Sequence, residues 1–180
     1  SIPIITAHLS IKDLGYIALF ELCLAPLVIL TNFSVDNIIK VNWYKVNKTE
    51  KNSLISGLFL FGFIISVILI VPTFYFANEM FFLIAGTEWF VINDLLPFIQ
   101  LSILSIIPKE IFNSWTIVDN RIKIRNIVNI FSTILITSLI ILSAIITNNY
   151  FSVIVAMISG RIFTGIIQII IIFTKIKFTI

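Results

Sequence analysis

The stretch that decides the fold runs from Leu54 to Phe76 and reads LISGLFLFGFIISVILIVPTFYF. It holds no Asp, Glu, Lys or Arg, and at 1.5 Å per residue a helix of this length crosses about 30 Å of hydrocarbon. The whole chain is 59% hydrophobic and 12% charged, about half the charge of a typical soluble domain. Only helices and closed barrels satisfy their backbone in lipid, and barrel strands alternate polar and apolar residues. The continuous apolar runs therefore predict membrane-spanning helices.

Four further apolar runs flank this one in the chain of 180 residues. Together they predict an all-α, multi-pass transmembrane bundle with five spans. Their expected ranges are Leu14–Phe33, Leu54–Phe76, Leu95–Val118, Ile127–Thr147 and Phe151–Thr174. Because the chain opens at Ser1 without a methionine, we expect it to be an excerpt of a longer protein.

Basic residues between the spans predict the orientation of the bundle. Nine Lys and Arg residues fall in the connections on one side, against Lys12 alone on the other, where Ala77–Asp94 carries only acidic charge. Cytoplasmic loops of membrane proteins are enriched in such residues. The nine are Lys40, Lys45, Lys48, Lys51, Arg121, Lys123, Arg125, Lys175 and Lys177. We further expect interfacial aromatic belts, with Trp43 and Tyr44 on one side and Trp89 and Tyr150 on the other. We expect Asp36 and Asp119 to be solvated loop residues.

Four charged residues fall inside the apolar runs: Glu21, Lys109, Glu110 and Arg161. A Lys or Arg at the centre of a span costs about 2.5–3.5 kcal/mol on insertion scales, and such residues usually face the interior of a bundle. They are therefore candidate functional residues.

The third run concentrates its polar residues on one helical face. By the helical period this face comprises Ser102, Ser105, Lys109, Asn113 and Thr116. Pro108 removes one backbone amide beside Lys109, which predicts a kink at that point.

The fifth run repeats this pattern more weakly, with Arg161, Thr164, Gly165 and Gln168 on one face. Two interpretations stay open for these polar faces. They line a hydrated substrate path, with Lys109, Arg161, Glu21, Glu110, Asn113 and Gln168 as candidates, or they are interhelical ion-pair contacts such as Glu110 with Arg161.

Small residues four apart predict close contacts between helices. The pairs are Ser53 with Gly57, Gly62 with Ser66, and Ala156 with Gly160. The chain has no cluster of Cys and His, no phosphate-binding glycine loop and no nucleophile–base motif, so we expect no metal, no cofactor and no enzyme activity. Most of its basic residues lie in short loops between the apolar runs, and nucleic acid is not an expected partner.

The segment Leu9-Ser10-Ile11-Lys12-Asp13-Leu14-Gly15-Tyr16 carries a short motif. Ser10 is suited to cap the first span, with the Asp13 carboxylate three residues on. The segment resembles the pattern Leu-Ser-x-x-Asp/Glu-x-Gly-Tyr of bacterial polysaccharide flippases of the O-antigen type, which are related to the MATE exporters. The family implies helices two to six of one half of a transporter with about twelve helices.

The resemblance also implies a function at the bacterial inner membrane. It implies transfer of an undecaprenyl-pyrophosphate-linked oligosaccharide between leaflets through a cationic cavity, with Lys109 and Arg161 as the matching positive residues. Glu21 and Glu110 would tune that cavity or couple to an ion, H⁺ or Na⁺. The alternatives are another exporter of the superfamily, a lipid II flippase, a membrane enzyme acting on polyprenyl phosphates, or a structural membrane subunit.

Overall fold

The computed structural model describes residues 2–32, 35–85 and 92–175, with side chains at most of these positions. Within these ranges the chain forms seven helices and no strand, which confirms the expected all-α class. The helices are α1 (Ile2–His8), α2 (Ile11–Asn32), α3 (Val35–Asn42), α4 (Lys48–Ala85), α5 (Ile92–Val118), α6 (Ile122–Thr147) and α7 (Tyr150–Lys175).

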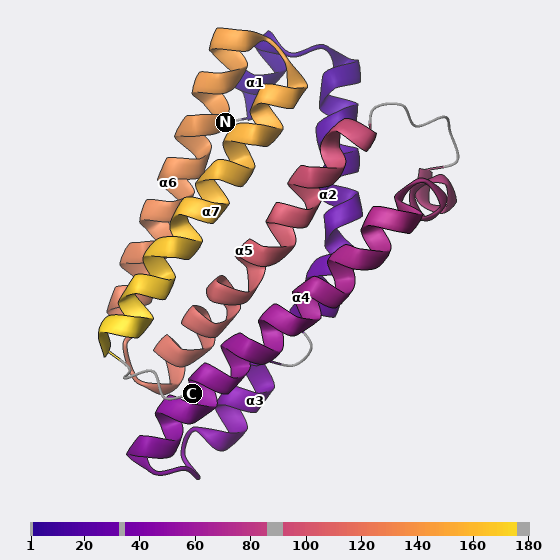
Figure 1. Ribbon diagram of the computed structural model, residues 1–180. Coiled ribbons are helices and arrows are strands. Elements are labelled where there is room, and N and C mark those ends of the chain that lie inside the picture. Colours follow the sequence, from indigo (N-terminus) through magenta and orange to yellow (C-terminus); the bar gives the residue numbers. More distant parts are fainter. Residues whose placement is uncertain (1, 33–34, 86–91, 176–180) are drawn as a thin grey trace.

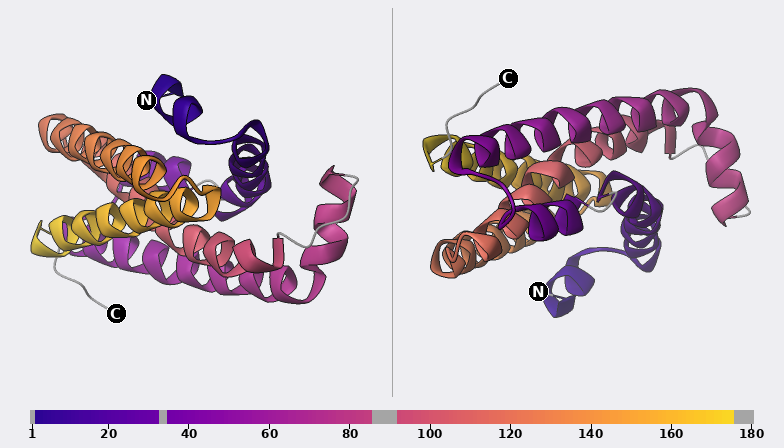
Figure 2. Two further views of the ribbon diagram at one scale, coloured as in Figure 1. Left: turned by 90° about the horizontal axis from the view of Figure 1, so that it is seen from above. Right: turned by 90° about the horizontal axis from the view of Figure 1, so that it is seen from below.

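Helix α5 lies at the centre of the bundle and contacts α2, α3, α4, α6 and α7. Figure 1 shows α6 and α7 as an antiparallel hairpin on one side of α5, with α2 and α4 on the other. The hairpin turns at Asn148, whose left-handed backbone (φ 48°) ends α6, as expected for a tight turn there. The views along the bundle show the last part of α4 turning away from the other helices (Figure 2).

Three of the described helices are long and apolar enough to cross a membrane, rather than the five expected. They are Glu50–Val71 within α4, Ile122–Thr147 and Tyr150–Lys175. The expected span Leu95–Val118 forms most of α5, which is not among the three, and Lys109 and Glu110 lower its hydropathy. The expected span Leu14–Phe33 forms most of α2, which ends at Asn32. Phe33 lies outside the described residues.

Helix α4 is longer than the sequence predicted, because it begins at Lys48 and continues to Ala85. The expected loop Ala77–Asp94 is therefore helical over 77–85. Helix α5 begins at Ile92, before the expected end of that loop at Asp94. Glu88 and Trp89 of that loop lie outside the described residues.

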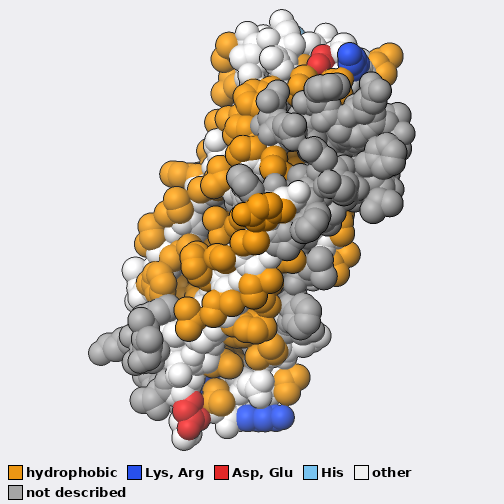
Figure 3. Space-filling view, turned by 45° about the vertical axis from the view of Figure 1, so that its right-hand side comes forward, with side chains coloured by type: hydrophobic (Ala, Val, Ile, Leu, Met, Phe, Trp, Pro, Cys, Tyr) orange, Lys and Arg blue, Asp and Glu red, His pale blue; other side chains and the backbone are white. Residues whose placement is uncertain are grey.

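One face of the bundle is divided along its length. On the face shown in Figure 3, hydrophobic side chains cover the middle, and the coloured acidic and basic side chains lie near the two ends. Helix α6 supplies much of the exposed apolar surface, including Ile127, Ile134 and Ile146. Such a distribution suits a membrane, in which lipid covers the apolar side chains.

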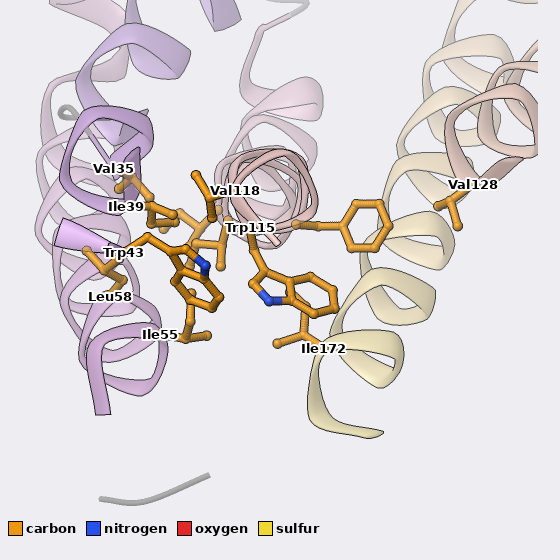
Figure 4. Packing of buried hydrophobic residues seen from close by; sticks show 12 residues of the cluster. Val35, Ile39, Trp43, Ile55, Leu58, Trp115, Val118, Val128 and Ile172 are labelled. Atoms are coloured by element: carbon orange, nitrogen blue, oxygen red, sulfur yellow. The ribbon is translucent and has the colours of Figure 1, made fainter. Parts of the chain in front are cut away.

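A cluster of large apolar side chains fixes α3 and the start of α4 against the end of α5. Trp43 and Trp115 point into it, with Ile55 of α4 and Ile172 of α7 nearby (Figure 4). Trp43 is only 4% exposed, so its expected place in an interfacial aromatic belt is wrong. Its indole completes the core instead, and the Lys51 ammonium lies 4.7 Å from the centre of its rings.

The short helix α3 was not expected. Its Asp36, expected to be a solvated loop residue, forms a tether between α3 and α5. The Ser114 hydroxyl of α5 donates to Asp36 Oδ1 (2.7 Å), and the Lys40 ammonium donates to Oδ2 (2.6 Å). Partial burial pushes the pKa of the Asp36 carboxyl upward, but the hydrogen bonds from Lys40 and Ser114 and the charge of Lys40 outweigh it. The pKa therefore lies below its ordinary value. Asp119 is likewise paired, with Arg121.

The glycines test the predicted close contacts between helices. A Cβ atom at Gly62 would lie 2.7 Å from Ile107 Cγ2 of α5, and one at Gly160 would lie 2.8 Å from Ile136 Cγ1 of α6. The contacts expected at these two glycines are confirmed. The expected contact at Gly57 is wrong, because a Cβ there would meet nothing within 4 Å.

Replacing Gly160 with Ala should destabilise the bundle, whereas Gly57→Ala should stabilise it or leave it unchanged. The added methyl at Gly160 also comes within 3.4 Å of the Ile136 backbone, and overpacking of this kind costs about 1–3 kcal/mol. At Gly57 only the gain in helix propensity remains, about 0.5–1 kcal/mol. Thermal unfolding in detergent measures both, and equal shifts of the two variants would contradict the packing.

The Asp36 tether predicts a loss of stability in acid. Because its pKa is lower in the fold than in the unfolded chain, Asp36 contributes stability above its unfolded value of about 3.9 and loses it as the pH falls through the lower folded value. The pair is partly exposed, so the contribution is about 1 kcal/mol at most. Asp36→Asn should lower the unfolding midpoint at pH 7 and flatten its fall below about pH 4. Parallel pH profiles of the variant and the unchanged protein would refute this tether.

Candidate functional site

The candidate site centres on an ion pair between α2 and α7. Arg161 Nη2 donates to Glu21 Oε1 at 2.5 Å, and the two side chains are 32% and 44% exposed. Met157, one turn earlier on α7, places its sulfur 3.6 Å from the same nitrogen. The ion-pair alternative named Glu110 as the partner of Arg161, and that assignment is wrong. Arg161 points across the bundle to α2, and its carboxylate partner is Glu21.

Close packing of α7 on its neighbours sets the position of Arg161. Gly160 lets α7 approach α6, and Gly165 lies where a Cβ would be 3.7 Å from the Ser105 carbonyl oxygen of α5. By helical spacing Arg161 lies on the same side of α7 as Gly165, one turn away. Its own carbonyl accepts a hydrogen bond from the Thr164 hydroxyl (2.9 Å).

The motif at the start of α2 sets the position of Glu21. The Ser10 hydroxyl accepts from the Asp13 amide (3.1 Å), and the Asp13 carboxylate accepts from the Ser10 amide (3.2 Å), which confirms the expected cap. Leu9 is buried against Ala144 and Val153 of the α6–α7 hairpin. The ring of Tyr16 lies 4.7 Å from that of Tyr150 at the start of α7. The motif therefore anchors α2 beside the hairpin.

The polar face of α5 is directed toward α6 and α7. The Asn113 side-chain oxygen accepts from Asn129 Nδ2 of α6 (3.3 Å), and Gly165 of α7 lies beside Ser105. Ser102 and Thr116 are buried and donate to carbonyls of their own helix. Lys109 shares this face by helical spacing, and its side chain is exposed.

Lys109 and Glu110 are adjacent but differ in surroundings. Lys109 is exposed, Glu110 is half-buried, and neither makes an ion pair within the described part of the chain. Pro108 is buried inside α5, which stays helical through it. The expected kink there stays a prediction.

Among the six candidates for a substrate path, Gln168 is the one with a buried polar atom that has no hydrogen-bond partner in the described part of the chain. The side chain is 2% exposed, and its Oε1 has no hydrogen-bond partner among the described residues. A buried acceptor left unpaired costs about 1–3 kcal/mol. It lies two turns beyond Arg161 on the same face of α7, as the spacing predicted.

Two contributors to the site were missed by the sequence analysis. Asn129 lies near the start of α6 and extends the α5 polar face onto a second helix. It could have been found as an Asn inside an otherwise apolar run. Met157 gave no polar signal, and only its distance from Arg161 shows its role.

The arrangement provides positive charge among apolar helices, which suits the binding of an anion. Arg161 holds one acidic partner, and Lys109 is an exposed cation with no ion pair among the described residues. No group of three His, Cys, Asp or Glu residues suited to a metal ion occurs in the described ranges. No protein-family model, curated protein or solved structure matches the chain.

Proposed function

We propose that the chain belongs to a membrane transporter that moves an anionic, lipid-linked oligosaccharide between leaflets, as in polysaccharide flippases of the O-antigen type. The proposal rests chiefly on the exposed Lys109 ammonium on the polar face of α5. A lysine on the lipid-facing side of a span would be costly, and one beside a hydrated path would not.

The proposal includes two membrane-crossing helices in addition to the three that are long and apolar enough to cross a membrane. Helices α2 and α5 pack within the same bundle as α4, α6 and α7. A central helix is covered by its neighbours and tolerates the polar face that lowers its hydropathy. We therefore propose that α2 and α5 also cross the membrane, with α3 and the basic connections in the cytoplasm.

The chemistry of the substrate fits these residues. A pyrophosphate offers several oxygens to cations, and charge-assisted hydrogen bonds strengthen away from bulk water. Lys109 and Arg161 supply such donors at different levels of the bundle. The lipid tail can stay in the bilayer while the polar head crosses beside α5.

Surface polysaccharide formed in a flippase-deficient bacterial host tests this function. Lys109→Ala should reduce it about 10-fold or more, since a hydrogen bond to a charged group contributes about 1.5–3 kcal/mol. Lys109→Arg keeps the charge and should retain most of the activity. Lys45→Ala, which removes an exposed lysine outside the spans, is the matched control.

Membrane levels of each variant are measured in parallel by immunoblotting. Full surface polysaccharide from the Lys109→Ala variant at an unchanged membrane level would contradict the proposed function. So would an equal loss in the Lys45→Ala control.

A further inference from the structure

Helices α2 and α7 contact each other mainly near the end of the bundle that carries the α6–α7 turn. Tyr16 contacts Tyr150 at that end, and Phe20 is buried with Ile154 and Ile158 farther along. The large cluster at the other end includes Ile172 of α7 but no described side chain of α2. Figure 1 and Figure 2 show the two helices side by side at the turn and apart at the other end.

The pair of Glu21 and Arg161 lies near the end of this contact that is farther from the α6–α7 turn. On α2 it follows Tyr16 and Phe20, and only Cys23 and Leu24 continue the shared cluster beyond it. It is also the single ion pair between α2 and α7 in the described part of the chain. An electrostatic contact at this position helps to hold the two helices together.

The geometry of the pair leaves room for a competing ligand. One nitrogen of the guanidinium contacts one oxygen of Glu21, so the planar fork is not used in full. Both side chains are partly exposed, and a ligand can reach them. A pyrophosphate carries more charge than a carboxylate and can bind a guanidinium with two parallel hydrogen bonds.

We propose that Glu21 is an internal competitor of the substrate, and that the pyrophosphate of the lipid-linked ligand takes its place on Arg161. Displacement of Glu21 removes the ion pair between α2 and α7 and loosens their contact beneath Tyr16 and Tyr150. Binding of the ligand is thereby linked to separation of the two helices. The inference rests on the proposed function and adds a role for Glu21 in controlling it.

Binding of farnesyl pyrophosphate to the protein in nanodiscs tests the competition. Glu21→Gln keeps the size of the side chain and removes its charge, so it should tighten binding about fivefold or more, the range of a typical coupling between two sites. Arg161→Gln should weaken binding to a similar or greater extent. In the double variant Glu21→Gln should have no further effect, since the residue for which it competes is gone.

Glu50→Gln is the matched control, because it removes an exposed carboxylate at the start of α4 that does not contact Arg161, and Gln can still accept the bond from the Asn47 amide. Unchanged or weaker binding in Glu21→Gln would overturn the competition, and so would equal tightening in Glu50→Gln. The proposed function survives those results if Arg161→Gln and Lys109→Ala still weaken binding. If neither weakens it, anion recognition itself fails. Inorganic pyrophosphate should bind more weakly than farnesyl pyrophosphate, and equal affinity would contradict a lipid-linked ligand.

Discussion

The cost of placing charge among apolar helices governs the arrangement of this bundle. Lys109, Glu110 and Arg161 cannot face hydrocarbon without a large penalty. The most polar of the long helices, α5, accordingly lies at the centre, where five other helices contact it. The most exposed apolar surface belongs to α6 at the edge. Arg161 reaches across the bundle to Glu21 of α2, which offsets part of the cost while leaving both groups partly exposed. Packing, polarity and the candidate site therefore follow from one constraint.

Features carried by local sequence could be predicted. The helical class follows from uninterrupted apolar runs, and the cap of α2 follows from Ser10 and Asp13 at the right spacing. The polar face of α5 follows from the helical period. Close contacts at Gly62 and Gly160 were predicted from small residues four apart, but the same signal failed at Gly57. Spacing alone does not tell which side of a helix meets a neighbour, so the identical pattern has different outcomes.

Features that depend on helices distant in the chain could not be predicted. Glu110 and Glu21 are both carboxylates inside apolar runs, and only the relative placement of α2 and α7 selects Glu21 for Arg161. Asp36 resembled a solvated residue because its partner Ser114 lies 78 positions away. Trp43 was expected at the membrane surface, yet α3 turns it into the core against α4 and α5. Each of these residues has two reasonable environments, and tertiary packing decides which one it occupies. The sequence alone therefore placed Asp36 and Trp43 at the surface and gave Arg161 the wrong carboxylate partner.

The central claim is that the polar face of α5 meets water within the bundle. Reaction of cysteines with a membrane-impermeant thiol reagent tests it directly, because the reactive thiolate forms readily only in a hydrated setting. In a Cys23→Ala background, which removes the single native cysteine, Lys109→Cys should react at a rate close to that of Tyr44→Cys in the exposed turn after α3. Ile134→Cys on the apolar face of α6, 61% exposed, should react far more slowly. Labelling of Lys109→Cys as slow as that of Ile134→Cys, with Tyr44→Cys fully reactive, would contradict the account.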